Sequence, residues 1–411
     1  MRVLVLTTSF PTDKKSMSGI FVFDECKRLV EQGIEVTVLA PHYPGSKRSE
    51  LMGGINVRRF RYMLPSGWQR LCYGAGMEPN MRENSFVLFL LIPFFLSFFL
   101  YTIWFSRKAD ILHCHWSPAG LVGAIVGKCI MRKATIYMEH HGIATTSRVH
   151  RLVLSWILQN ADFVLANSSF TLDRILEVAK PRRRAVLPPG INMSCFSAQE
   201  RTDDFYKTVG FKCDVPLLLS VGRFIDFKGF GYLIEAIEIL VYKMERPNIQ
   251  LLIVGDGPLR ASLDTMVCEK DIERNIRMVG IVPPENMPTH YSHADIVVAP
   301  SIIDDHGNTE GLGLTLIEAN ACGVPCVASR VGGITDVIED GVNGLLVEPR
   351  NPVQLAEKID YLLRHPKQRE KMGEAGRRIV SRKYNSKSTA ERLVQCYEEM
   401  KLIGVACSKG Y

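Results

Sequence analysis

The sequence has no pair of Cys-x-x-Cys motifs and no Asp-x-Asp motif. The first absence excludes the common structural zinc sites. The second leaves only Asp203-Asp204 and Asp304-Asp305, whose spacing differs from that of an Asp-x-Asp metal site. The eleven cysteines are an odd number and are scattered from Cys26 to Cys407. We therefore expect reduced, mostly buried thiols in a cytosolic protein rather than a disulfide framework.

A long apolar run is also missing at the amino terminus, where residues 1–9 read Met-Arg-Val-Leu-Val-Leu-Thr-Thr-Ser. This run is too short for a signal peptide and predicts a buried first strand, so we expect a cytoplasmic location. Of the 411 residues, 46% are hydrophobic and 23% are charged, which is typical of a folded α/β protein. The length predicts two domains, because a single core rarely grows to that size.

Acidic residues are scarce in the first half of the chain. Residues 1–200 hold 24 Lys and Arg against 14 Asp and Glu, whereas residues 201–411 hold 26 against 29. The basic half indicates an anionic partner such as phospholipid, a phosphorylated substrate or nucleic acid, with a solvated basic face as the alternative. Because no nucleic-acid recognition motif accompanies the charge, we expect no nucleic-acid partner.

Short apolar runs alternate with helical patterns along the chain, which predicts two parallel, doubly wound sheets of the Rossmann-like kind. The punctuation Pro188-Pro189-Gly190 marks the junction between them. We predict domains over residues 1–195 and 205–385, and a helix and tail over 386–411 that could extend back to the first domain. The expected strands are Arg2–Thr7, Val36–Pro41, Ile111–Trp116, Thr135–His140 and Phe163–Ser168, then Pro216–Phe224, Leu251–Gly257, Ile276–Gly280, Ile296–Ser301, Cys326–Arg330 and Gly344–Val347.

One long apolar run does occur, over residues 86–105, where only three residues are not apolar. About 20 such residues would span a bilayer as a helix. A span would, however, place strands of one sheet on opposite sides of the membrane. A helix that is apolar all round can bury only one side against a sheet. We therefore predict that this helix contacts an anionic membrane, aided by the flanking Arg82, Arg107 and Lys108; a helix packed deep in the core is the alternative.

The most informative run begins at Glu310 and reads Glu-Gly-Leu-Gly-Leu-Thr-Leu-Ile-Glu as far as Glu318. Gly311 and Gly313 predict a turn with free backbone N–H groups, leading into a helix whose positive end faces any bound anion. This pattern indicates a diphosphate site. The two carboxylates, one before the helix and one inside it, can accept hydrogen bonds from the hydroxyl groups of a sugar and of a ribose.

A guanidinium and an ammonium lie close together after a predicted strand, in the segment Gly222-Arg223-Phe-Ile-Asp-Phe-Lys228-Gly229. An Arg and a Lys in a loop are more often surface charges. Beside the run from Glu310 to Glu318, they are a suitable clamp for a leaving diphosphate.

These segments resemble the retaining glycosyltransferases of family 4, and the similarity extends over nearly the whole chain. Glu310 and Glu318 match the E-x7-E signature of that family, and Arg223 and Lys228 match its Gly-Arg and Lys-Gly pair. The resemblance implies the GT-B architecture, in which two Rossmann-like domains face each other across a cleft, and transfer with retention of anomeric configuration. It also implies that Glu310 contacts the transferred sugar, that Glu318 binds the ribose, and that phosphate and sugar are held by the backbone of Gly311, Leu312, Gly313 and Leu314.

Three further segments resemble parts of the family's site. Gly19, in Ser-Met-Ser-Gly-Ile, matches a glycine loop under the donor phosphates, and Ile281 and Val282 match the backbone that holds the base. His141, which precedes Gly142, matches a histidine beside the primary hydroxyl of the sugar and the reaction centre. The predicted catalytic residues are therefore Glu310, His141, Arg223 and Lys228.

A second pair of histidines, His113 and His115, alternates on a predicted strand, so that both face the same side. A metal site needs more ligands than these two, and we favour packing or contact with the acceptor over metal binding. Two positions depart from the family pattern: Pro189-Gly190-Ile191-Asn192 stands where Asn-Gly-Val-Asp is common, and Asp336 stands where Glu is usual.

The sequence thus predicts an enzyme that moves a sugar from a nucleotide-diphosphate sugar, with UDP favoured, to a hydroxyl of a lipid-linked, glycolipid or envelope polysaccharide acceptor. We expect it at the inner face of the membrane. We expect no metal or other cofactor, because Arg223, Lys228 and a helix N-terminus supply positive charge for the leaving group. The alternatives are a non-catalytic nucleotide-sugar-binding membrane-associated protein and a related GT-B epimerase. A phosphorylase would need a lysine for pyridoxal phosphate, and no motif indicates one.

Overall fold

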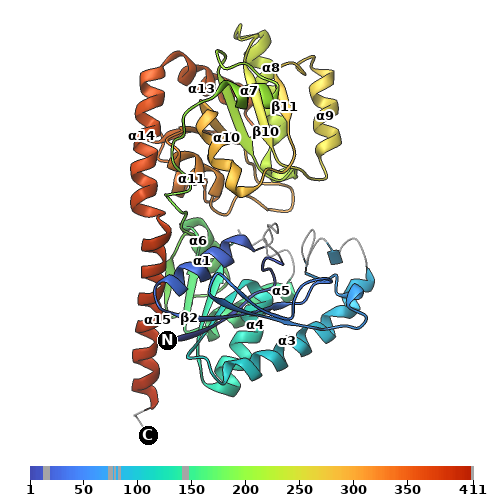
Figure 1. Ribbon diagram of the computed structural model, residues 1–411, viewed down its shortest axis with the longest axis vertical. Coiled ribbons are helices and arrows are strands. Elements are labelled where there is room, and N and C mark those ends of the chain that lie inside the picture. The colour runs from blue at the N-terminus through green and yellow to red at the C-terminus, as the bar shows by residue number, and fades with distance from the viewer. Residues whose placement is uncertain (13–18, 73–76, 78–79, 82–84, 141–147, 409–411) are drawn as a thin grey trace.

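The computed structural model describes residues 1–12, 19–72, 77, 80–81, 85–140 and 148–408. It contains two α/β domains, which lie one above the other along the long axis in Figure 1. Each domain is built on one sheet, and the two sheets have eight and six strands. The predicted pair of Rossmann-like sheets is confirmed.

The first sheet has the strand order β3-β4-β2-β1-β5-β6-β7-β8 and is parallel except for the antiparallel pair β3 and β4. Its order reverses between β1 and β5, so the carboxyl ends of these two strands border the switch point where such sheets bind ligands. The strands are β1 (Arg2–Leu6), β2 (Glu35–Pro41), β3 (Ser49–Met52), β4 (Ile55–Phe60), β5 (Ile111–His115), β6 (Ala134–Glu139), β7 (Phe163–Ala166) and β8 (Arg184–Val186).

The second sheet has the order β11-β10-β9-β12-β13-β14, and all its strand pairs are parallel. Its switch point lies between β9 and β12. The strands are β9 (Leu217–Val221), β10 (Gln250–Val254), β11 (Ile276–Met278), β12 (Ile296–Ala299), β13 (Cys326–Ser329) and β14 (Gly344–Val347).

Helices cover both sheets. Those of the first domain are α1 (Ile20–Glu31), η1 (Ser66–Trp68), η2 (Ser85–Leu90), α3 (Leu91–Ser106), α4 (Trp116–Ala124), η3 (Ile125–Met131), α5 (Arg148–Asn160) and α6 (Ser169–Val178). Those that follow are α7 (Asp203–Val209), η4 (Asp226–Lys228), α8 (Phe230–Tyr242), α9 (Arg260–Glu269), η5 (Pro284–Asn286), α10 (Met287–His293), α11 (Leu314–Ala321), α12 (Ile334–Val337), α13 (Pro352–Arg364), α14 (Pro366–Lys383) and α15 (Ser386–Ser408).

Strands β3, β4 and β8 are not among those predicted from the sequence. In β4 the buried positions include Arg59, a charged residue that hides the expected apolar alternation. Its guanidinium forms an ion pair with Glu50 of β3 and donates hydrogen bonds of 2.8 Å to the carbonyls of Lys47 and Pro11. Burial of the charge is thus compensated by partners that lie far apart in the sequence.

The last helix, α15, returns to the first domain, as the sequence suggested it could. Figure 1 shows α14 beside the second domain and α15 beside the first, one after the other in a long column. Leu393, Tyr397 and Met400 of α15 are buried in the core that includes β1, β2 and α1. The first domain is therefore completed by residues that come after the whole second domain in the chain.

The two crossings between the domains lie side by side. Ile191, in the first crossing, forms a parallel bridge with Asn385, and its N–H donates to the carbonyl of Tyr384 at 2.8 Å. A Cβ atom on Gly190 would lie 2.4 Å from the Cα of Ser386. The close approach therefore requires glycine at this position, which explains why the junction carries one.

The apolar run of residues 86–105 forms two elements rather than one helix, a 3-10 segment (η2) and then α3. Phe94, Phe98 and Thr102 are buried against β1, β2 and β4 at a spacing of four residues. The opposite stripe of α3 is exposed and equally apolar. Because the strands before and after α3 pair in one sheet, the helix lies on the domain surface, although it is long and apolar enough to cross a membrane.

Candidate active site

A pocket lies at the switch point of the second sheet. The carboxyl ends of β9 and β12 form one wall, and Glu310, Gly313 and Thr315 form another. Lys228 reaches the pocket from η4, the short turn that follows β9. The pocket is thus at the edge of the sheet where parallel α/β domains bind their ligands.

Lys228 is held in place by the glycine after it. Gly229 has φ 68° and begins α8. A Cβ atom there would lie 2.1 Å from the carbonyl oxygen of Pro300, which follows β12. The loop after β9 therefore packs directly on the end of β12, which brings Lys228 to the pocket.

The ammonium of Lys228 forms an ion pair with Glu310, with 2.5 Å between Nζ and Oε2. Both side chains are mostly buried. Arg223 lies in the same loop and is exposed. Within the described residues its guanidinium makes no hydrogen bond or ion pair, so it is available to an anion at the mouth of the site.

Two glycines hold the backbone of Glu310 and Gly311. Gly333 donates its N–H to the carbonyl of Glu310 at 2.9 Å. A Cβ atom on Gly332 would lie 2.1 Å from that carbonyl oxygen, and one on Gly333 would lie 2.1 Å from the carbonyl oxygen of Gly311. The Gly-Gly pair after β13 thus allows this segment to pack against the backbone of Glu310 and Gly311. This packing sets the position of the Glu310 carboxylate.

Helix α11 begins at the pocket. Gly313 is its N-cap residue, with φ 94°, a conformation that favours glycine. The N–H groups of the first turn of a helix have no acceptors within the helix, and the helix dipole makes this end positive. With Lys228 nearby, the pocket offers a backbone and a side-chain site for negative charge.

Glu318 lies inside α11, where its Oε2 accepts a hydrogen bond of 2.6 Å from the hydroxyl of Tyr291 in α10. Burial raises the pKa of Glu318 to about 7, and the hydrogen bond from Tyr291 opposes this rise. The carboxyl group therefore titrates near pH 7 and is oriented by the hydrogen bond from Tyr291. Tyr291 was not predicted, because a tyrosine on an ordinary helix gives no sequence signal of its contact with a distant glutamate.

Ile281 and Val282, the predicted contacts of the base, follow β11 and are not among the residues that line the pocket. Ile281 is 71% exposed. Gly280 accepts a hydrogen bond of 2.8 Å from the N–H of Gly255, so this segment lies beside the turn after β10. Ile281 and Val282 therefore lie beyond the carboxyl end of the edge strand β11, beside the turn after β10.

The first domain presents Gly19 and His140 among the described residues. Gly19 is the N-cap of α1 with φ 68°, and a Cβ atom there would lie 2.3 Å from the carbonyl oxygen of Ser9. His140 follows β6 and is buried, and its Nε2 lies 2.8 Å from Nδ1 of His115. Residues 16–18, His141 and Gly142 lie outside the described residues.

Three residues that the sequence did not predict join the two domains at this site. Ser168 donates from its hydroxyl to the carbonyl of Gly311 at 2.6 Å. The N–H of Ser169 donates to Asp336 Oδ2 at 2.5 Å, and the Ser169 hydroxyl donates to the other carboxylate oxygen. Asp336, the position that departs from the family pattern, thus caps α6 across the domain boundary.

Both domains thus have the Rossmann-like form, and the switch point of the second carries a cation–carboxylate pair and a helix N-terminus, an arrangement that suits a phosphate-bearing ligand. Comparison with known families agrees: residues 202–379 match the model "Glycosyl transferases group 1", and residues 18–194 match "Glycosyltransferase Family 4". Together these matches cover both domains. The chain belongs to glycosyltransferase family 4 and is a glycosyltransferase that uses a nucleotide-sugar donor.

Individual relatives are distant. The chain is 28% identical to the GDP-mannose-dependent alpha-(1-6)-phosphatidylinositol monomannoside mannosyltransferase of Mycolicibacterium smegmatis, over 72% of this chain and 75% of that protein. Sucrose-phosphate synthase from Thermosynechococcus elongatus superposes with a TM-score of 0.79 at 24% identity, covering 97% of this chain and 98% of the other. Anabaena HepE in complex with UDP-glucose gives a TM-score of 0.72 at 17% identity, covering 97% and 100%. The two structures show that the architecture is GT-B.

Proposed function

We propose that this glycosyltransferase moves a sugar from a UDP-sugar to a hydroxyl of a lipid-linked, glycolipid or envelope polysaccharide acceptor, with retention and without a metal ion. The observation that carries the proposal is the Lys228–Glu310 ion pair at the end of α11. It supplies a cation for a diphosphate and a carboxylate for a sugar in a single pocket. Retention is the stereochemistry that the family resemblance implies.

Donor binding would rearrange this pair. A diphosphate beside α11 competes with Glu310 for the Lys228 ammonium, which releases the carboxylate toward the sugar. Arg223, exposed and without a side-chain partner in the described part of the chain, then adds a second cation. The bond between the anomeric carbon and the phosphate oxygen breaks, and the bond to the acceptor oxygen forms on the same face. The acceptor's proton passes to the leaving phosphate oxygen.

The choice of UDP rests on the structural likeness to HepE, whose complex holds UDP-glucose. The mycobacterial relative uses GDP-mannose by its name, so the donor must be tested directly. Purified protein should be incubated with UDP-, GDP- and ADP-sugars, and release of the nucleoside diphosphate measured. We expect turnover with a UDP-sugar and its loss in Glu310→Gln, whereas the matched surface variant Glu348→Gln should retain it. Absence of binding and turnover with every donor would overturn the proposal.

The acceptor class rests on the exposed stripe of α3, with Ile92 76%, Leu96 57%, Leu100 56% and Trp104 65% exposed. Four large apolar side chains at a spacing of four residues form one continuous face, which needs a cover. Arg107 lies 5.2 Å from the Trp104 ring centroid, so a cation stands beside an aromatic ring at the end of the stripe. An aromatic ring and basic residues beside an apolar face suit the interface of an anionic bilayer.

We place this contact at the inner, cytoplasmic face of the membrane, and liposome sedimentation tests the contact itself. The variant carrying Ile92→Ser, Leu96→Ser, Leu100→Ser and Trp104→Ser should fold, because the stripe is exposed, and should no longer sediment with anionic vesicles. The control carries Val149→Ser and Leu152→Ser on the exposed side of α5 and should still bind. Equal sedimentation of both variants, or equal binding of the parent protein to neutral vesicles, would contradict an anionic membrane contact.

A further inference from the structure

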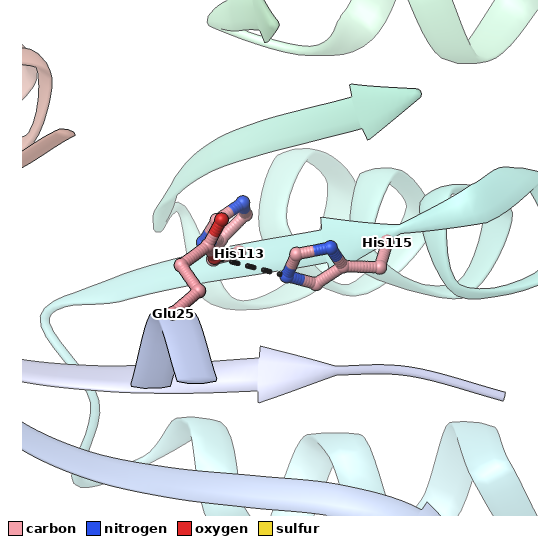
Figure 2. Close-up of side chains that lie close together, drawn as sticks. All are labelled: Glu25, His113 and His115. Carbon is pink, nitrogen blue, oxygen red and sulfur yellow. Dashed lines mark ion pairs between the residues drawn. The ribbon is translucent and has the colours of Figure 1, made fainter. Parts of the chain in front are cut away.

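A cluster of three side chains in the first domain remains outside the donor site. Glu25 reaches from α1 toward His113 and His115, which lie on the same face of β5 (Figure 2). One ligand atom from each of the three side chains can be chosen so that all three lie within 4.8 Å of one another. Both histidine side chains are fully buried, and the Glu25 side chain is 11% exposed.

Each side chain of this cluster has one polar atom without a hydrogen-bond partner in the described part of the chain. Glu25 Oε1, His113 Nε2 and His115 Nε2 are buried and have no hydrogen-bond partner in the described residues. Glu25 Oε1 lies 3.4 Å from His115 Nε2 and 3.7 Å from His113 Nδ1. These distances exceed those of good N–H···O hydrogen bonds, about 2.7–3.2 Å. The distance from Glu25 Oε1 to His115 Nε2 is close to the separation of about 3.3 Å between ligands that each lie about 2.0–2.1 Å from one tetrahedral ion.

The Nδ1 atoms of both rings have polar neighbours. His115 Nδ1 lies 2.8 Å from His140 Nε2, and His113 Nδ1 lies 2.8 Å from the hydroxyl of Tyr397. Metal-binding histidines usually use one ring nitrogen for the ion and donate the other N–H to a polar neighbour.

We propose that Glu25, His113 and His115 bind a divalent cation of the Zn²⁺ type. Two imidazole nitrogens and a carboxylate are ligands that suit such ions. The cation would offset the cost of burying the Glu25 carboxyl group, whose side chain is mostly buried.

The ion would fix α1 to β5 and act as a positioning element rather than on the sugar. Helix α1 begins at Gly19, the residue predicted to lie under the donor phosphates. Through its other nitrogen, His115 orients His140, which directly precedes the predicted catalytic His141. The donor reaction itself would still rely on Arg223 and Lys228 for positive charge.

The test measures metal in untagged full-length protein, purified after expression with added Zn²⁺, by elemental analysis. We expect about one ion per chain, a lower melting temperature after chelation and its recovery on adding Zn²⁺. Cobalt substitution should give visible absorption bands. In Glu25→Gln the metal content should fall strongly, whereas in His150→Asn, a control for an exposed histidine of α5, it should remain.

Parent protein that folds without bound metal and does not change its melting temperature with Zn²⁺ would overturn the proposal. So would an unchanged metal content in Glu25→Gln, because the ion would then be bound elsewhere. Neither measurement uses glycosyl transfer, so failure here is distinct from failure of the proposed donor chemistry.

Discussion

Lys228 and Glu310 neutralise each other across the donor pocket at a distance of 2.5 Å. The ion pair avoids the free-energy cost of burying either charge without a partner. A donor diphosphate, which carries more negative charge than a carboxylate, would replace Glu310 as the partner of Lys228. We therefore expect the ion pair to stabilise the empty site and to change its pairing when the donor binds.

Replacing Lys228 by Ala should lower kcat by about 10²–10³-fold, because a positioned cation is lost from the leaving group. It should also lower the melting temperature, since Glu310 would be left partly buried and unpaired. Arg223→Ala should reduce donor turnover with little change in melting temperature, because Arg223 is exposed. Steady-state kinetics and thermal unfolding of both variants check this pairing; a Lys228→Ala enzyme with parental kcat would contradict it.

We expect Glu318 to make donor binding depend on pH. Its pKa of about 7 means that the carboxyl group is largely protonated below neutrality in the unliganded protein. A ribose that donates hydrogen bonds favours the ionised form, so donor binding releases a proton there. Affinity for the nucleotide should fall by up to about tenfold for each pH unit below 7.

Calorimetric titrations with the nucleoside diphosphate between pH 5.5 and pH 8, in buffers of different ionisation enthalpy, measure both the affinity and the proton release. In Glu318→Gln both the proton release and this part of the pH dependence should disappear. An unchanged pH profile in that variant would assign the dependence to the phosphate groups of the ligand instead.

At the scale of elements, the two crossings between the domains act as one connection. The first crossing, at Ile191, and the junction of α14 and α15, at Asn385, pair through backbone hydrogen bonds. Motion of one domain relative to the other must therefore bend the two chain segments of this connection together. Such paired crossings favour rotation about one axis over free movement.

Gly190→Val should disturb this connection, because its Cβ would lie 2.4 Å from the Cα of Ser386. We expect destabilisation by about 1–3 kcal/mol, the usual cost of overpacking. Denaturant unfolding measures the effect, with Gly67→Val as the control, since a Cβ at Gly67 meets nothing within 4 Å. Equal stability of the two variants would show that the crossings separate without cost.

At the scale of the whole molecule, Ser168, Ser169 and Asp336 tie the domains together beside the donor pocket. Asp336→Ala should weaken this tie and shift the unliganded protein toward a more open arrangement with a larger radius of gyration. Solution X-ray scattering measures this change, and Asp305→Ala, which removes a fully exposed carboxylate, is the matched control. Identical scattering from both variants would mean that other contacts decide the arrangement.

Much of this architecture is predictable from local sequence. Each strand with a continuous apolar run was expected, and the run from Glu310 to Glu318 indicated a helix beginning at a pocket. Contacts between distant segments could not be predicted, because they depend on the assembled fold. Tyr291 beside Glu318 and Glu25 beside the two histidines of β5 are examples. Each of these residues has the appearance of an ordinary side chain of an amphipathic helix.

The apolar run of residues 86–105 shows the same limit. Its composition makes every large side chain equally suited to lipid or to a core. Only the position of each side chain around the helix axis decides whether it is buried or exposed. Phe94 and Phe98 lie in the core, whereas Ile92 and Leu96 are exposed. The register also makes the membrane contact testable, because the exposed residues can be changed without creating cavities.

The return of α15 also determines the order in which the molecule can mature. Leu393, Tyr397 and Met400 fill part of the first domain's core, yet a ribosome adds them after both sheets have been made. Until α15 has been synthesised, the first domain therefore lacks the side chains that cover the apolar patch beside α1. The helices of the second domain have all been synthesised by then. The domain that is made first is the one that finishes folding last.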